Sequence, residues 1–265
     1  MLKRTKYKKI LILFLLSFTC LFWFTSSFSH FKLNANIRLY HIVHEDGQIR
    51  LLARMPLAYL IADKLGSIQE DGLPAPAPYS TNLLIDDVLN HKLDATTLRE
   101  NPKGLGQFFA DGTIIKISDK KLKPVVGRVV AYPLSKQKPF STLIEAETSL
   151  SSEVYNREYK ETFIGDTIID IELVYLTNKK IKKYTIQSLL NPRLPKQEET
   201  ANLIIDHTNK EPNIYRITGL LDKSVNITNS AIKAFSTFVV NGFIHILEGY
   251  DHILFILCLI VGAQN

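Results

Sequence analysis

Two long apolar runs frame the chain, and between them apolar and polar residues alternate over short distances. The first run covers residues 10–24, ILILFLLSFTCLFWF, and the second covers residues 234–261. Alternation with a period of two is typical of half-buried strands, whereas long uninterrupted apolar runs are typical of signal sequences and membrane spans. The pattern therefore predicts a folded domain, residues 30–230, between two membrane-directed ends.

The alternating stretches of the middle predict a mostly β domain. Residues 167–176 are apolar at every second position, and Asp46-Gly47 between two β-prone runs indicates a hairpin, because glycine accepts a positive φ at the turn. Helices do not alternate with the later strands, which excludes a βαβ fold and favours an antiparallel, sandwich-like arrangement. The expected strands are residues 36–44, 48–55, 113–117, 127–132, 167–176, 182–190, 202–207 and 213–221.

Two short helices are expected among these strands. Pro56 suits the first turn of a helix over residues 57–65, LAYLIADKL, and Gly66 can end it. In residues 82–93, NLLIDDVLNHKL, apolar side chains at positions 84, 85, 88 and 89 recur with the spacing of one helix face. Residues 72–80, rich in proline and alanine, predict extended and exposed chain rather than core.

The amino end, residues 1–29, has the order of a signal peptide or signal anchor. Five cations precede the first apolar run, and small polar residues follow it. Fifteen helical residues reach about 22 Å, less than the ~30 Å of the hydrocarbon core. A cleaved signal is the first interpretation, and an uncleaved anchor that includes residues 25–28 is the alternative. In either case residues 30–230 would lie outside the cytoplasm.

The charge distribution argues against a nucleic-acid partner. The net charge of the 265 residues is +6, but the five cations of residues 1–9 account for most of it and leave +1 for residues 10–265. A nucleic-acid binder needs a basic face on its folded domain. The two cysteines, Cys20 and Cys258, both lie in the apolar runs, so residues 21–257 contain no disulfide, thiolate zinc site or cysteine nucleophile.

The second apolar run predicts a transmembrane helix over residues 231–262, with residues 263–265 as a truncated end. Residues 234–261 contain no Lys or Arg, and 28 residues are enough to cross a bilayer with some tilt. Ionisable side chains at membrane depth normally face a protein interior or a water-filled path. We therefore expect further transmembrane helices or subunits, as in a longer polytopic protein. The ionisable side chains are His245, Glu248, Asp251 and His252.

These four side chains have the geometry of a candidate metal site. On a helix His245 and His252 differ by only about 20° and Glu248 lies about 60° from His245, whereas Asp251 points about 120° away. The two histidines are about 10.5 Å apart along the axis, too far to share one ion directly, but Glu248 can share an ion with either. Imidazole and carboxylate together suit nickel, cobalt or zinc.

Other uses of the same helix remain open. Gly242 and Gly249 leave gaps where a neighbouring helix can approach, and the polar side chains could then only lock a bundle by hydrogen bonds. A proton relay and an intramembrane enzyme with a metal-bound water are further alternatives. We favour metal handling, because ionisable groups inside a membrane are costly.

The segment GFIHILEGYDHILFILCL, residues 242–259, resembles the first membrane helix of HupE/UreJ-type proteins. Their His-x5-Asp-His signature is matched by His245, Asp251 and His252, whereas Glu248 is not part of that signature and depends on helix geometry alone. The order of a signal peptide, a large β-rich domain and a membrane bundle resembles one branch of the family. The resemblance implies a nickel or cobalt permease or accessory protein in a bacterial inner membrane, with its large domain periplasmic.

The resemblance also implies partners. They are membrane lipids, further transmembrane helices or subunits and a divalent metal ion. Nickel or cobalt would be the cargo and not a permanently bound cofactor. We expect no nucleic-acid partner and no enzyme activity. The family's second histidine-rich motif has no counterpart in residues 1–265. An anchored extracytoplasmic binding or adaptor module without transport is therefore the alternative.

A weaker group of candidate ligands lies at the start of the domain. In a strand His41 and His44 point to opposite faces, which argues against a shared capture site for metal. His91 and His207 are expected to be isolated surface or sheet residues. The residues of this weaker group are His30, His41, His44, Glu45 and Asp46.

One basic run lies inside the domain. Residues 179–183 read KKIKK and predict a solvated hairpin end. Clustered lysines next to a membrane are attracted to anionic lipids, so this end could also touch headgroups.

Overall fold

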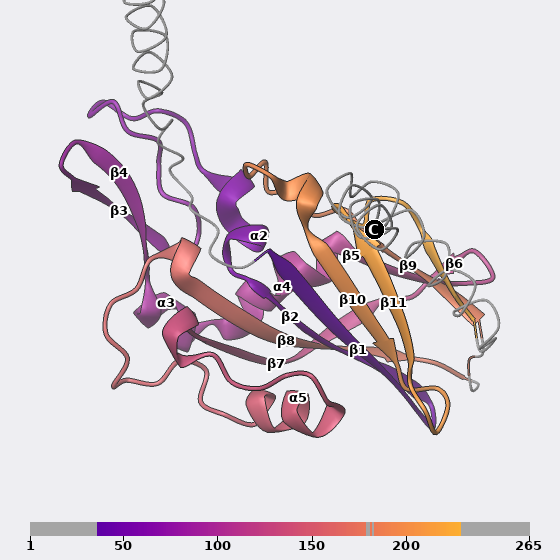
Figure 1. Ribbon diagram of the computed structural model, residues 1–265. Coiled ribbons are helices and arrows are strands. Elements are labelled where there is room, and N and C mark those ends of the chain that lie inside the picture. Colours follow the sequence, from indigo (N-terminus) through magenta and orange to yellow (C-terminus); the bar gives the residue numbers. More distant parts are fainter. Residues whose placement is uncertain (1–35, 179–180, 182, 229–265) are drawn as a thin grey trace, which may run out of the picture. The chain divides into compact units, whose positions relative to one another are not determined.

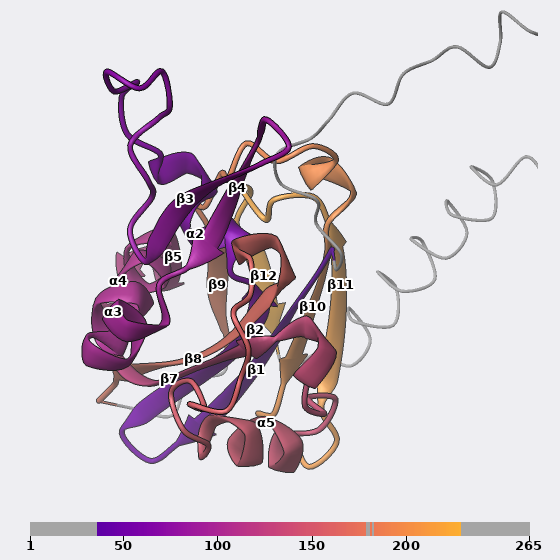
Figure 2. The same ribbon diagram turned by 90° about the vertical axis from the view of Figure 1, so that its left-hand side faces the viewer.

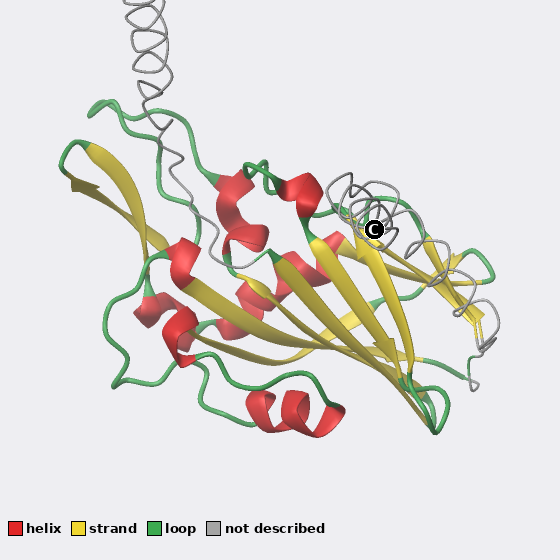
Figure 3. Cartoon of the chain, in the orientation of Figure 1, coloured by secondary structure: helices red, strands yellow, loops and turns green. Residues whose placement is uncertain are grey.

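The computed structural model describes residues 36–178, 181 and 183–228, and these form a mostly β domain with short helices (Figures 1 and 3). The strands are β1 (Ile37–Glu45), β2 (Gln48–Pro56), β3 (Ser80–Ile85), β4 (Val88–Leu93), β5 (Thr113–Ile117), β6 (Lys120–Lys121), β7 (Pro124–Pro133), β8 (Thr167–Leu176), β9 (Lys183–Ser188), β10 (Ala201–Asp206), β11 (Asn213–Thr218) and β12 (Val225–Thr228). The α-helices are α2 (Ala58–Ile61), α3 (Ala95–Glu100), α4 (Pro102–Gly112) and α5 (Leu143–Leu150). Short 3₁₀ helices are Ala62–Lys64, Leu134–Lys136, Ile164–Asp166 and Gln197–Glu199.

The strands form two larger sheets and one hairpin. The six-stranded sheet has the order β11-β10-β1-β2-β8-β7, the four-stranded sheet has the order β12-β9-β5-β6, and β3 pairs with β4. β1 and β10 run parallel, with Ile37 opposite Ala201, so a wholly antiparallel arrangement is wrong at this pair. The chain passes through β9 of the other sheet before β10, and such a crossover allows it to return beside β1 in the same direction.

The predicted strands are found in the structure. β8 has the predicted bounds, and β1 and β2 form the predicted hairpin, with Glu45 opposite Gln48. Gly47 has a φ of +79° at the turn, where a side chain would be strained. The alternating pattern was therefore sufficient to locate these strands.

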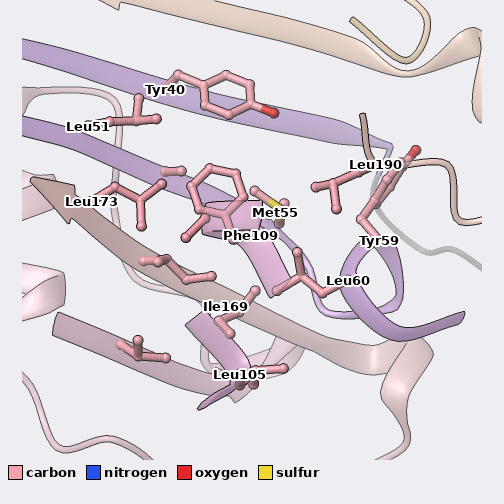
Figure 4. Packing of buried hydrophobic residues seen from close by; sticks show 14 of the residues in the cluster. Tyr40, Leu51, Met55, Tyr59, Leu60, Leu105, Phe109, Ile169, Leu173 and Leu190 are labelled. Atoms are coloured by element: carbon pink, nitrogen blue, oxygen red, sulfur yellow. The ribbon is translucent and has the colours of Figure 1, made fainter. Parts of the chain in front are cut away.

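One face of the six-stranded sheet buries the main hydrophobic core (Figure 4). Leu51 of β2 and Leu173 of β8 lie on this face with Tyr40 of β1, whose ring stacks on Phe109 of α4 at 6.4 Å between centroids. Ile186 of β9 belongs to the same cluster, so the four-stranded sheet and α4 share one core with the six-stranded sheet. This agrees with the expectation of a mostly β domain.

Helix α4 packs against β7 and β8, and one of its glycines allows a close approach to β7. Asn101 caps its first turn by accepting a hydrogen bond from Gly104 N at 3.0 Å. A Cβ on Gly106 would lie 2.5 Å from a methyl of Val126 and 3.0 Å from one of Val129, so only glycine permits this approach. Together with α3 and α5, α4 is a helix that the sequence did not predict.

The helix expected over residues 82–93 is wrong, because this segment is the β3–β4 hairpin. Asp86 and Asp87 form its two-residue turn with φ values of 49° and 60°. Hairpin turns of this length favour positive φ at both positions, and aspartate tolerates that conformation better than most residues. Apolar residues on either side of such a turn mimic the spacing of a helix face.

The other helix and the proline-rich stretch are partly as predicted. α2 and the 3₁₀ helix after it lie within residues 57–65, but Pro56 ends β2 instead of starting the helix. In residues 72–80, Ala77 and Tyr79 are buried in the core, which corrects the expectation of exposed chain. Tyr79 Oη donates a hydrogen bond to Asn101 O at 2.9 Å.

Candidate functional site

The predicted metal-binding side chains lie outside the described residues. This applies to His245, Glu248, Asp251 and His252, and also to the packing glycines Gly242 and Gly249. Both apolar runs lie outside them as well. Among the residues that the structure describes, no helix is long and apolar enough to span a bilayer.

Several ion-paired side chains of the six-stranded sheet lie on its face opposite the main core, which we call the α5 face. α5 and α4 lie on opposite sides of this sheet (Figures 1 and 2). The period of a strand explains the separation: in β8, Ile169 and Leu173 face the core, whereas Asp170 and Glu172 face α5.

Asp170 is the centre of a buried network on the α5 face. Arg54 of β2 binds it with two hydrogen bonds, from Nε at 2.7 Å and from Nη2 at 2.8 Å. Tyr132 of β7 and Ser149 of α5 also donate to it, at 2.9 Å and 2.6 Å. Burial and the Asp170 carboxylate raise the pKa of Tyr132 far above its ordinary value, so its hydroxyl stays protonated and donates.

A second network on the same face joins α5 to the sheet near the β1–β2 turn. Arg50 donates to Glu172 at 2.8 Å, to Glu45 at 2.8 Å and to Glu147 of α5 at 3.0 Å. Arg128 donates to the other oxygen of Glu172 at 3.0 Å. Burial works against ionisation of Glu172, but the hydrogen bonds from Arg128 and Arg50 outweigh it and lower the pKa of this carboxyl. These charged groups satisfy one another, so the networks hold α5 on the sheet.

The structure pairs two histidines that the sequence leaves apart. His41 Nδ1 lies 2.9 Å from His207 Nε2, and His41 Nε2 lies 2.9 Å from the Phe140 carbonyl. A carbonyl only accepts, so His41 carries its proton on Nε2 and accepts at Nδ1 from His207. Burial lowers the pKa of both histidines, consistent with a neutral pair. The expectation that His207 is isolated is wrong, because the parallel pairing of β1 and β10 brings the two strands together.

His44 points to the other face of β1, as predicted for two strand residues that are three positions apart. Its Nε2 lies 3.1 Å from Asp206 Oδ1, and its ring lies 5.4 Å from that of Tyr184 on the core side. His91 lies on β4 with Nδ1 3.2 Å from Asn82 Oδ1. His30 lies outside the described residues. Within the described ranges, no group of three or more His, Cys, Asp or Glu side chains could hold a metal ion.

The last described strand is β12. It is one edge of the four-stranded sheet, and Thr228 lies opposite Lys183 of β9. Tyr215 of β11 donates from its hydroxyl to Thr228 O at 3.0 Å, which ties this end to the edge of the other sheet. Residues after Thr228 carry the predicted membrane motif.

The last part of the chain is similar to a known protein family. The family model described as HupE / UreJ protein matches residues 222–265, which include β12 and the His-x5-Asp-His segment. The match confirms the resemblance predicted from the sequence, over these residues. No curated protein matches the chain.

Proposed function

We propose that this chain is a membrane protein that handles nickel or cobalt through its segment 231–262, with residues 30–230 as an extracytoplasmic domain. The observation that carries the proposal is the HupE / UreJ match over residues 222–265, because it falls on the only long apolar run that contains ionisable side chains. His245, Asp251 and His252 would bind the passing ion, and Glu248 would share it.

In this proposal the described domain does not bind the metal ion itself but is positioned next to the membrane segment. On the α5 face Arg54 pairs with Asp170 and Arg50 pairs with Glu172, and the residues that the structure describes contain no cluster suited to a metal. Metal chemistry in this proposal therefore lies in the membrane segment. The domain would lie next to the segment, because the family match begins at residue 222, within the described domain, and includes β12.

The proposal is tested by radiolabelled nickel or cobalt uptake in cells that carry the full-length protein, normalised to the membrane-inserted protein. His252→Ala is expected to abolish uptake, and Asp251→Asn to weaken it, because the second change keeps the shape but removes the charge. Leu254→Ala, on the same segment but without a ligand atom, is the matched control and should retain most uptake. Normal uptake per molecule in both variants would refute metal handling.

A binding or adaptor module without transport is the second candidate, and one surface feature favours it. The β3–β4 hairpin exposes three consecutive apolar side chains, Leu83, Leu84 and Ile85, with exposed fractions of 41%, 50% and 41%. Exposed apolar clusters on a folded domain are typical of interaction sites. If the polar helix only assembles a complex, the His252 and Asp251 variants should lose protein level or assembly, with uptake per surviving molecule unchanged.

A further inference from the structure

A cavity of about 340 Å³ lies where the edges of the two larger sheets meet. β11 is an edge of the six-stranded sheet and β12 is an edge of the four-stranded sheet, and Tyr215 joins them through Thr228. The cavity is lined by Lys183, Tyr215, Arg216, Ile217, Val225, Asn226 and Thr228.

The lining combines two cations with an apolar wall and contains no carboxylate. Lys183 and Arg216 are exposed, and within the described residues neither has an ion pair or a side-chain hydrogen bond. Ile217 and Val225 are half-buried and form the apolar part. Arg50 on the α5 face, by contrast, binds three carboxylates. The two cations of this cavity are therefore available to an anion that also has an apolar portion.

The position of the cavity limits which anion can reach it. Thr228 lies in the lining, and residues 229–233 separate it from the apolar run that begins at Ala234. Even a fully extended chain covers only about 20 Å over this interval. A cavity so close to the start of a membrane span lies within reach of the lipid headgroups. In the sequence Lys183 is the last residue of the KKIKK run, residues 179–183, and it is the first residue of β9.

We propose that this cavity binds the phosphate of an anionic lipid headgroup and seats the domain on the membrane surface beside its own span. Lys183 and Arg216 contact the phosphate, Asn226 and Thr228 supply hydrogen bonds, and the apolar wall contacts the glycerol region. The inference rests on the proposed function only in requiring that residues 234–261 span the membrane. Two cations close to an anionic membrane surface should make binding of the domain to that surface about 30-fold stronger than binding to a neutral surface.

The test uses the full chain in vesicles, with Cys20 and Cys258 replaced by Ser and a fluorophore on Ser224→Cys. Ser224 is exposed, directly precedes β12 and is not part of the cavity lining. The vesicles contain phosphatidylcholine alone or mixed with phosphatidylglycerol, each with a nitroxide on some headgroups. Strong quenching is expected only in the mixed vesicles, and it should weaken as salt is added.

Paired variants assign the effect to the cavity. Lys183→Gln with Arg216→Gln should remove most of the difference between the two kinds of vesicle. Lys120→Gln with Lys121→Gln changes the same charge on β6, at the opposite edge of the same sheet, and should leave the difference in place. Equal losses in both double variants, or quenching that is independent of phosphatidylglycerol, would overturn the proposal.

Two further arms separate the other outcomes. Titration of inorganic phosphate into the protein in phosphatidylcholine vesicles should give no heat that depends on Lys183 and Arg216, and such heat would assign the cavity to free phosphate instead. A fluorophore on Phe238→Cys should be quenched by acyl-chain nitroxides. If Phe238→Cys is not quenched, the span and the proposed function both fail. If it is quenched but Ser224→Cys is not, only the lipid seat fails.

Discussion

The buried ion pair between Arg54 and Asp170 gives a sharp test of what holds α5 on the sheet. The side chain of Asp170 is fully buried, that of Arg54 is 3% exposed, and the carboxylate accepts four hydrogen bonds. Asp170→Asn keeps the volume but leaves the Arg54 guanidinium charged and unpaired in the interior. Breaking a buried pair from one side costs about 3–5 kcal/mol, a large part of the ~5–15 kcal/mol that stabilises a typical domain.

The assay is thermal and urea unfolding of residues 30–230 followed by circular dichroism. For a domain of this size, a loss of 3–5 kcal/mol corresponds to a decrease in Tm of roughly 6–20 °C. Glu161→Gln is the matched control, because Glu161 is 79% exposed and pairs with Lys92 at the surface. Such surface pairs contribute less than about 1 kcal/mol.

A double variant separates the effect of the unpaired charge from the effect of the changed side-chain volume. Arg54→Met with Asp170→Leu removes both charges, so no uncompensated charge stays in the interior, and it should be more stable than Asp170→Asn alone. The reasoning is refuted if Asp170→Asn costs no more than Glu161→Gln, or if the double variant is the least stable of the three.

Three other predictions concern pH, the core and topology. Burial lowers the pKa of His41 and His207 in the folded domain, so as the pH falls the unfolded chain binds these protons first. The free energy of unfolding should therefore be highest above pH ~6.5 and should decrease below it by up to about 1.4 kcal/mol per pH unit for His41. Urea unfolding at several pH values should show a smaller decrease in His41→Gln. Phe109→Ala, at a fully buried position, should cost about 3–5 kcal/mol in urea unfolding, whereas Phe108→Ala, partly buried beside it, should cost clearly less, and equal losses would contradict the packing. Single cysteines at Ser152 and Asn178 should react with an impermeant thiol reagent once the outer barrier is opened, and protection of both until the inner membrane is lysed would contradict an extracytoplasmic domain.

The strands were predictable because their signal is local. In β8 the apolar residues alternate with polar ones, and this already places Asp170 and Glu172 on the face opposite the core. Helices were less predictable from the same signal. α4 contains three glycines and begins with a proline, so its local helix signal is weak, and Gly106 packs closely against β7. The β3–β4 hairpin has the sequence pattern of a helix, because its two-residue turn gives the apolar residues on either side the spacing of a helix face.

The sequence by itself determined the two apolar runs, the concentration of positive charge at the amino end and the His-x5-Asp-His motif, because each is a property of neighbouring residues. Only the tertiary structure decided which distant groups meet. His41 and His207 are 166 positions apart and pair because β10 returns parallel to β1, and Arg54 meets Asp170 across the β2–β8 pair, 116 positions apart. These contacts are determined by strand pairing and by the free-energy cost of burying an unpaired polar group. Both depend on residues far apart in the sequence, so the local pattern does not predict them.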